Sequence, residues 1–583
     1  MLLKFLLSQT SLPCTIFTLT SLSLLFGVSE DNNYPEIFRK EPKEYDFIVI
    51  GAGTAGSVIA NRLTENGNWN VLLLEAGKEE PLLTAIPAFT ELFTGTPYDW
   101  KYQTRPENNA CNLRGFVPLR GGKVMGGTTS INYMLYVRGN REDYNNWERM
   151  GNTGWSYNDV LPYFMKSEDN RDQDILQGGS MYHGTGGYLT VERFQHVDPR
   201  TNIILRAYQE FGLRPTDING ENQIGSMLAQ STTRNGSRMS TNRAFIRPIR
   251  RRNNLFIKNQ VYVTKILIEP ITKIAYGVQY TSTLTGDTKI ALAKKEVIIS
   301  AGSIESPKLL MLSGIGPIKE LFLHAIPILK NLSVGHNLHD HMGALGLVGS
   351  TGEGFSFFPS CERNMNDLND FYDQHRGPLA SVGPISATGF FQTTQENRTG
   401  VPDIQLFNGG FSPILPYYNM FGIIPAILAP KTRGFVRLNK LNPILGNPEI
   451  NHKCLADADV DTLREATYMA IRIFNTTVFR ENNFTLINKP LPGCHMHEYN
   501  TDDYWNCVIR KFSFLVNEQV GTCKMGPRED TEAVVDPRLR VHGIKNLRVA
   551  DASIIPVIPR GSTMAPVIMI GEKASDMIKQ DWP

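Results

Sequence analysis

The sequence predicts an α/β fold with at least two lobes, and three observations support this class. The chain has 583 residues, and single hydrophobic cores tend to split beyond about 250 to 300 residues. Near the N-terminus, a buried-strand pattern, a glycine turn and a helical pattern follow one another directly. Hydrophobic residues make up 41% and charged residues 20% of the chain, which is the balance of a globular protein.

The first residues predict a secretory signal. Lys4 precedes a largely apolar stretch, and the small residues Gly27 and Ser29 indicate cleavage near Ser29, which makes residues 1–29 the signal peptide. The alternative is an uncleaved anchor, since the stretch approaches the roughly 20 residues that span a bilayer. Its Ser and Thr content favours cleavage. We therefore expect a secreted protein without stable membrane insertion.

Glycosylation and disulfide signals agree with a secretory route. Of the 7 cysteines, Cys14 lies in the predicted signal, and the remaining even set permits disulfides whose connectivity the sequence does not define. Cys494 and Cys507 are the first pair we expect, because of their spacing. No Cys/His spacing is typical of a zinc site, so we expect no metal. Asn-X-Ser/Thr sequons begin at Asn235, Asn331, Asn397, Asn475 and Asn483.

The net charge gives no reason to expect a nucleic-acid partner. Lys and Arg number 59 against 57 Asp and Glu, which leaves a formal charge of +2. The run from Arg247 to Arg252 is a local basic exception. We interpret it as a solvated loop before a strand, and expect no nucleic acid to bind there.

A dinucleotide site is predicted at the first strand. Tyr45 to Ile50 is a short apolar run typical of a buried parallel strand, and residues 57–64 have helical spacing. Between them, Gly51 permits a tight turn, Gly53 lets backbone approach a pyrophosphate, and Gly56 allows close packing of helix on strand. The helix N-terminus then offers N–H groups to phosphates.

A second strand strengthens this interpretation. Val71 to Glu75 is predicted to be a second strand that ends in a carboxylate, close to the roughly 20-residue offset at which an acid meets the ribose hydroxyls. A carboxylate there disfavours a 2′-phosphate and hence NADP. The alternative is a glycine turn that binds no nucleotide.

Four further segments resemble the glucose-methanol-choline (GMC) flavin oxidoreductases. They are the glycine-rich Gly122–Asn132, the turn and helix Gly302–Gly316, the string Asn-Glu-Gln-Val-Gly-Thr-Cys-Lys-Met-Gly at 517–526, and Val549–Ser553. The likeness extends over nearly the whole mature chain. It is most similar to insect glucose dehydrogenase-like members.

The resemblance implies a Rossmann-like FAD-binding domain and a second, α+β substrate domain built on an antiparallel sheet. It places a GMC N-terminal region with substrate-domain insertions at 43–345, mainly substrate domain at 346–534, and the return to the FAD domain at 535–583. Because Ile131 stands where some relatives attach FAD through a histidine, we expect non-covalent FAD. The implied flavin-site residues are Gly51, Gly53, Gly56, Glu75, Gly127, Asn132, Val261, Ala301, Asp551 and Val567.

The resemblance also implies a reaction, alcohol plus acceptor to aldehyde or ketone, and a departure at both catalytic positions. Glu518 stands where the family has its catalytic histidine, and Met564 aligns with a second His or Asn. General-base assistance is typically worth about 10² to 10⁴ in rate. Glu518 could replace the base after burial raises its pKa, or it could join a structural network. His339 lies in a segment that resembles a structural loop of the family.

The predicted partners are a small-molecule alcohol and an electron acceptor, oxygen or quinone. Pro/Gly-rich stretches with aromatics, Gly352–Ser360 and Phe411–Pro430, are interpreted as substrate-lobe loops, which favours a hydrophobic alcohol. Asp457–Ile473 is predicted to be an amphipathic surface helix. The alternative function is a catalytically degenerate, FAD-containing secreted paralogue that acts as a lyase or binds a ligand.

Overall fold

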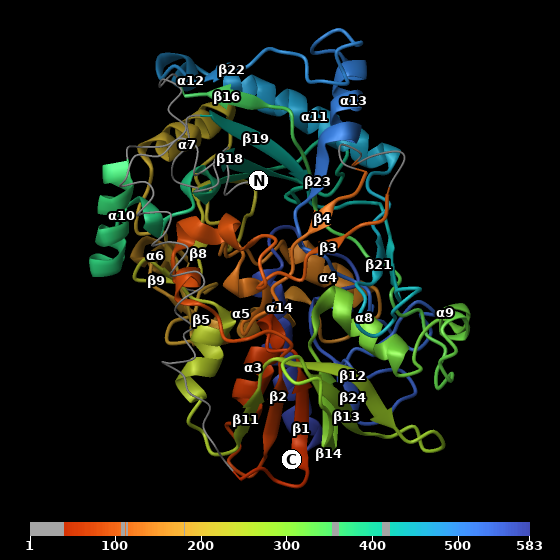
Figure 1. Ribbon diagram of the computed structural model, residues 1–583. Helices are drawn as coiled ribbons and strands as arrows, with labels where there is room; N and C mark the ends of the chain where they lie inside the picture. Colours follow the sequence, from red (N-terminus) through yellow and green to blue (C-terminus); the bar gives the residue numbers. More distant parts are fainter. Residues whose placement is uncertain (1–39, 107–110, 112–114, 180, 352–360, 411–419) are drawn as a thin grey trace.

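The structure is a computed structural model that describes residues 40–106, 111, 115–179, 181–351, 361–410 and 420–583. The predicted signal at 1–29 and the stretch Gly352–Ser360 lie outside the described residues. Two sheets organise the chain, one in the lower and one in the upper half of Figure 1. This arrangement confirms the α/β class with a second lobe on an antiparallel sheet.

The lower sheet has seven strands in the order β11-β2-β1-β14-β13-β12, and β24 pairs with β14. The pairs β1–β2, β1–β14, β2–β11 and β14–β24 are parallel, whereas β12, β13 and β14 run antiparallel. The strands are β1 (Tyr45–Ile50), β2 (Val71–Leu74), β11 (Leu255–Lys258), β12 (Val261–Ile268), β13 (Ala275–Ser282), β14 (Thr288–Ile299) and β24 (Leu547–Val549). The predicted bounds of β1 are confirmed, and β2 ends at Leu74, one residue before the predicted end at Glu75.

Helices α3 (Thr54–Leu63) and α14 (Met564–Asp581) pack against each other in this lobe. α3 begins three residues before the predicted helix because the glycine turn already closes at Gly53, its N-cap. A buried ion pair joins the two helices: the Arg62 guanidinium donates to both carboxylate oxygens of Glu572 at 2.8 Å. The first and last helices described are thus held together.

The upper sheet is antiparallel, with the order β22-β16-β19-β18-β17-β7, and β15 joins β19 to β23. α11 (Asp457–Phe474), α7 (Pro199–Phe211) and α13 (Asp502–Phe512) lie in the same lobe (Figure 1). The predicted helix at 457–473 is confirmed within one residue. The strands are β7 (Gly225–Leu228), β15 (Met342–Ala344), β16 (Val348–Ser350), β17 (Ala387–Phe391), β18 (Ile404–Gly410), β19 (Met420–Ile427), β22 (Thr485–Leu486) and β23 (Ser513–Leu515).

β19 corrects one prediction. Phe411–Pro430 was expected to be a loop; residues 411–419 lie outside the described part, but Met420–Ile427 is a strand that pairs with β18, β16 and β15. Pro425 misled the sequence argument, since proline inside a run usually indicates an edge strand or a loop. Here Pro425 stands opposite Leu406 in an otherwise apolar strand.

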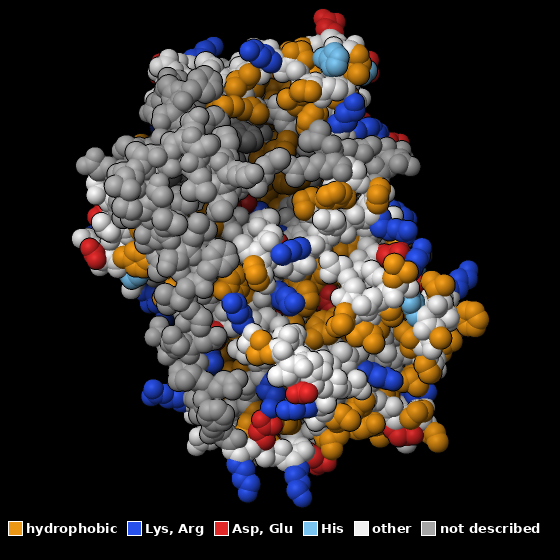
Figure 2. Space-filling view, viewed as in Figure 1, with side chains coloured by type: hydrophobic (Ala, Val, Ile, Leu, Met, Phe, Trp, Pro, Cys, Tyr) orange, Lys and Arg blue, Asp and Glu red, His pale blue; other side chains and the backbone are white. Residues whose placement is uncertain are grey.

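The basic run from Arg247 to Arg252 corrects a second prediction. Arg247–Ile249 forms a 3₁₀ turn, and Arg247 and Arg250 pair with the buried carboxylate of Glu79 at 3.1 and 2.6 Å. The solvated-loop interpretation was therefore wrong for these two side chains, because a buried acid on a distant segment needs their charge. On the face shown in Figure 2, basic and acidic side chains are interspersed rather than gathered by sign.

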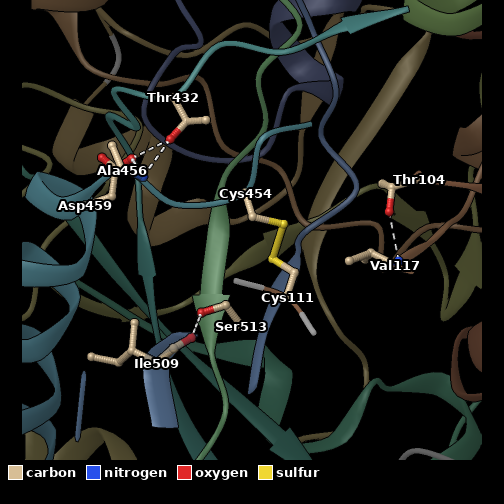
Figure 3. The surroundings of a disulfide bond; sticks show 9 residues. All are labelled: Thr104, Cys111, Val117, Thr432, Cys454, Ala456, Asp459, Ile509 and Ser513. Atoms are coloured by element: carbon tan, nitrogen blue, oxygen red, sulfur yellow. Dashed lines mark hydrogen bonds between the residues drawn. A yellow bond between two sulfur atoms is a disulfide. The ribbon is translucent and has the colours of Figure 1, made fainter. Parts of the chain in front are cut away.

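Two disulfides among the described residues fasten the upper lobe. Cys494–Cys507 confirms the expected pair, and Cys111–Cys454, separated by 343 residues, had not been predicted. Figure 3 shows how the second bond joins the segment that carries Thr104 and Val117 to the approach to α11. That segment follows β3 (Tyr102–Gln103) and precedes β4 (Pro118–Leu119), and Tyr102 lines the cavity described below.

The other helices and strands complete the described part of the fold. The helices are α4 (Arg141–Arg149), α5 (Tyr157–Ser167), α6 (Gln173–Gly179), α8 (Gly302–Leu312), α9 (Ile318–Leu323), α10 (Cys361–Gln374) and α12 (Thr477–Glu481). The strands are β5 (Glu168–Asn170), β6 (Leu189–Arg193), β8 (Gln230–Ser231), β9 (Thr233–Arg234), β10 (Ser237–Arg238), β20 (Phe435–Arg437) and β21 (Glu449–Asn451). Within the part of the chain that the structure describes, no helix is both long and apolar enough to cross a membrane.

Candidate active site

A cavity of about 910 Å³ gathers most of the residues that the sequence predicted for the flavin, together with both departing catalytic positions. Its volume is near the upper end of ordinary ligand sites. Gly56 does not line it; a Cβ at Gly56 would lie 1.9 Å from the carbonyl oxygen of Gly51, so its role is close packing. The predicted residues at the cavity wall are Gly51, Gly53, Glu75, Gly127, Asn132, Val261, Ala301, Asp551 and Val567, besides Glu518 and Met564.

Glycine backbones make the narrowest part of this wall. Gly51 has φ +96°, and a Cβ there would lie 2.4 Å from the carbonyl oxygen of Ser300. A Cβ at Gly127 would lie 2.7 Å from the Cα of Gly53. The two glycine-rich segments therefore approach each other backbone to backbone, and α3 points its N-terminal N–H groups at the same place.

Glu75 directly follows β2 at the carboxyl edge of the sheet. Its carboxylate accepts hydrogen bonds from the backbone N–H of Ala52 at 2.9 Å and of Gly77 at 2.8 Å. Burial raises the pKa of Glu75 to about 7, although these bonds and the charge of Lys123 oppose the change. A buried acceptor on this edge fits a ribose hydroxyl.

Asp551 organises the opposite wall. Its carboxylate accepts from the backbone N–H of Gly302 at 2.9 Å and from the hydroxyl of Ser306 at 2.6 Å, at the N-terminus of α8. Burial raises the pKa of Asp551, and the same hydrogen bonds oppose the rise. Glycine cradle, ribose acceptor and helix N-termini together fit an adenine dinucleotide.

Glu518 faces the N-terminus of α14. One carboxylate oxygen accepts from the backbone N–H of Thr563 at 2.8 Å, and it also accepts from the Thr563 hydroxyl. Burial raises the pKa of Glu518, and the bonds from Thr563 and Ser562 oppose that rise. The carboxylate is thus held in one orientation beside the cavity, at a position where the helix dipole favours negative charge.

Asp340 was not predicted to belong to the site. Its carboxylate accepts from the backbone N–H of Asn517 at 3.1 Å, from that of Glu518 at 2.8 Å and from the side chain of Gln519 at 2.9 Å. Burial raises its pKa well above the usual value, and the nearby Glu518 charge raises it further. The two acids are 178 residues apart, so only the fold brings them together.

Met564 and Asn132 face each other across the same part of the cavity. The Asn132 side-chain amide donates to the Met564 sulfur at 3.3 Å. A thioether is a weak acceptor, so this amide N–H can turn to a stronger acceptor on a bound ligand. Asn132 therefore offers a hydrogen-bond donor where the family's second catalytic group was expected.

A polar group that the sequence analysis missed lies elsewhere on the wall. The Arg120 guanidinium donates to Glu91 at 2.5 Å, and the Tyr133 hydroxyl donates to the other oxygen of Glu91. The Arg120 backbone N–H donates to the side chain of Asn517, next to Glu518. Nothing in the local sequence pattern distinguished these residues, because none belongs to a motif.

No described residue lining the cavity is a histidine. His339, in the segment expected to be a structural loop, is fully buried, and its Nε2 accepts from the backbone N–H of Ile558 at 3.0 Å. Burial lowers its pKa well below the usual value, so the ring is neutral. In the described ranges, no group of His, Cys, Asp and Glu side chains is arranged to hold a metal ion.

Sequence comparisons place the chain among known proteins. The models of the GMC oxidoreductase N- and C-terminal domains match residues 45–343 and 430–571. Glucose dehydrogenase [FAD, quinone] of Drosophila pseudoobscura pseudoobscura is 41% identical over 568 residues, which cover 94% of this chain and 88% of that protein. Ecdysone oxidase of Bombyx mori is 35% identical over 570 residues, 92% of this chain and 82% of that protein.

Solved structures agree with this assignment. A formate oxidase has a TM-score of 0.83 at 25% identity, covering 93% of this chain and 99% of that one. A pyridoxine 4-oxidase from Mesorbium loti has a TM-score of 0.78 at 26% identity, covering 91% and 99%. The chain therefore belongs to the GMC oxidoreductases, and its cofactor is FAD.

Proposed function

We propose that this protein is a secreted oxidoreductase that uses non-covalently bound FAD to oxidise the CH–OH group of a small, hydrophobic alcohol, with oxygen or a quinone as electron acceptor. The observation that carries the proposal is the shared cavity: the glycine cradle, Glu75 and Asp551 border the same space as Glu518 and Met564. A site that binds only the flavin would not need Glu518 and Met564 beside it.

FAD supplies the electron sink for the hydride that leaves the alcohol carbon. The chain supplies position and proton transfer. Asn132 offers an amide donor, and Glu518 lies in the place of the usual base, with a pKa that burial raises toward the range useful for proton transfer near neutral pH. We propose that Glu518 accepts the hydroxyl proton while Thr563 holds its carboxylate in place.

A hydrophobic alcohol is proposed from the wall on the side of the upper sheet, where most side chains are apolar. The Glu91–Arg120–Tyr133 group provides polar contacts at one place on this wall, so a substrate with one further polar group can be held. The apolar side chains include Leu135, Ile385, Phe407, Ile424 and Phe514.

Secretion is proposed from the predicted signal, the two disulfides and the sequons. All five sequon asparagines are exposed and so accessible to glycosylation. Non-covalent FAD is proposed because Ile131, a fully buried apolar residue, has no group that could form a bond to the flavin. We also retain the division of the chain at 43–345, 346–534 and 535–583.

Anaerobic mixing with alcohols tests the proposed function. We expect the flavin absorbance band of the purified protein to bleach with at least one member of a panel of terpenols, sterols, aromatic alcohols and sugars. The contrary result is a flavin that stays oxidised while its spectrum shifts saturably. That result would support the alternative that the protein binds a ligand without oxidising it. The contact of Glu518 with Thr563 also favours this alternative, because a carboxylate that accepts from two donors is a weaker base.

A further inference from the structure

Arg238 is a fully buried cation directly behind the cavity wall. Its side chain is 0% exposed, at the end of β10. Among the described residues, its guanidinium donates only to neutral acceptors, and two of the residues that accept, Thr129 and Asn132, line the cavity. The acceptors are the carbonyl oxygens of Thr84 at 2.7 Å, Thr129 at 3.2 Å and Asn132 at 2.6 Å, the side-chain oxygen of Asn132 at 3.0 Å and the hydroxyl of Thr90 at 2.7 Å.

No carboxylate among the described residues pairs with this guanidinium. Glu80 is the acid that most affects Arg238, but its carboxylate already lies 2.8 Å from Arg243 and 3.3 Å from Arg247. Burial lowers the pKa of Arg238 to about 9, which still leaves it protonated at neutral pH. An uncompensated charge in a buried place is costly, so its retention suggests a use.

The contact with Asn132 fixes the direction of that amide. A guanidinium can only donate, so the amide group that faces it must be the oxygen. The same oxygen also accepts from the backbone N–H of Met134 at 3.1 Å. The NH₂ group of Asn132 is therefore turned toward Met564 and the cavity, where it can donate to a bound ring.

We propose that Arg238 is a positioning residue for the flavin reaction: it turns the Asn132 amide donor into the cavity, and its buried charge favours reduction of the bound FAD. A hydride carries two electrons and one proton, so the bound group gains one negative charge when it accepts a hydride. A nearby cation stabilises that charge through a medium of low dielectric constant. The inference rests on FAD occupying the cavity and does not require that an alcohol is oxidised.

Thr90 permits a test that leaves Arg238 in place. Its hydroxyl accepts from Arg238, it is buried, and it does not line the cavity. Thr90→Asp would pair with the guanidinium and neutralise it, whereas Thr90→Asn has a similar shape and no charge. Relative to Thr90→Asn, we expect Thr90→Asp to lower the two-electron midpoint potential of the bound flavin by at least about 30 mV. This shift corresponds to a tenfold change in the equilibrium constant for reduction.

Direct substitution gives a second measurement. Arg238→Gln should lower the potential as Thr90→Asp does, while Arg238→Lys keeps the charge and should stay within 30 mV of the wild type. The control is the double variant Arg62→Gln with Glu572→Gln. It removes a buried ion pair that does not line the cavity and should leave the potential unchanged. The potentials are measured by dye-coupled titration of folded, flavin-loaded protein, without substrate.

The inference is wrong if Thr90→Asp and Thr90→Asn have equal potentials, or if Arg238→Lys lowers the potential as far as Arg238→Gln. If Arg238→Gln holds no flavin, the Thr90 pair decides the question alone. A wild type that holds FAD but oxidises no alcohol would end the proposed function and leave these comparisons intact. The two proposals therefore fail by different results.

Discussion

Replacing Glu518 by glutamine separates a catalytic carboxylate from a structural one. Glutamine has nearly the same shape and keeps an oxygen that can accept from the Thr563 backbone N–H, as the Glu518 carboxylate does at 2.8 Å. It cannot take a proton. If Glu518 is the base, the rate of flavin reduction by alcohol should fall by about 10² to 10⁴, which corresponds to about 3 to 5 kcal/mol of activation free energy.

The same substitution should make the flavin-free fold more stable at neutral pH. Burial raises the pKa of Glu518, so the folded state holds its proton more tightly than the unfolded state does. The stability that this group contributes is full below its ordinary pKa of 4.5 and is lost as pH rises through the raised value. Glu518→Gln should therefore raise the melting temperature at pH 7 and change it little at pH 4.

Stopped-flow reduction under anaerobic conditions provides the rate, and thermal unfolding of the flavin-free protein provides the stability. Glu305→Gln is the control, because Glu305 also lines the cavity but accepts from Tyr102 and Tyr262. An active wild type whose rate is unchanged by Glu518→Gln refutes the catalytic role. If the wild type is inert, the double variant Glu518→His with Met564→Asn should gain flavin reduction by alcohol. No gain would show that the replacement of the family's catalytic residues at these two positions is not the cause of the inactivity.

Three further predictions concern the cofactor wall and the upper lobe. The pKa of Glu75 is about 7 in the folded protein against 4.5 in the unfolded chain, so above pH 7 the ionised carboxylate costs the flavin-free fold about 3 kcal/mol. Glu75→Gln should therefore raise the free energy of unfolding of the flavin-free protein at pH 8 but not at pH 4. Equal effects at both pH values would contradict this. Gly53→Ala should fold, since its Cβ would lie 3.8 Å from Gly127, yet bind FAD at least tenfold more weakly in fluorescence titration, whereas Gly67→Ala, with open space around its Cβ, should bind normally. Replacing Cys494 and Cys507 by serine opens a loop of 13 residues and should cost about 3 kcal/mol in denaturant unfolding; a loss below about 1 kcal/mol would show that the bond adds little.

Local patterns predicted the elements that hold the nucleotide. The strand at 45–50 has the predicted bounds, and α8 (Gly302–Leu312) lies within the segment Gly302–Gly316 where a turn and a helix were expected, because each is defined by a short apolar period and by glycine or serine punctuation. The glycine turn between β1 and α3 is also local. The fold class and the family could therefore be inferred before the structure was known.

Long-range contacts could not be inferred. Asp340 binds the backbone of Glu518 across 178 positions, and Cys111 meets Cys454 across 343. The basic run looked solvated because its acid partner, Glu79, is 168 residues from Arg247 in sequence. Pairing at such distances depends on the order of strands and helices, which the linear pattern does not encode.

The charges around the cavity suggest why these long-range contacts are retained. Burial raises the pKa of Glu75, Asp340, Glu518 and Asp551, so each acid destabilises the flavin-free fold when it is ionised at neutral pH. On the other side of the wall, Arg238 is buried without an acid partner among the described residues. Of these groups, Glu75, Glu518 and Asp551 line the cavity, and Arg238 donates to two residues that line it, Thr129 and Asn132. Buried charges that cost the flavin-free fold stability are typical of a site that is completed by its ligand.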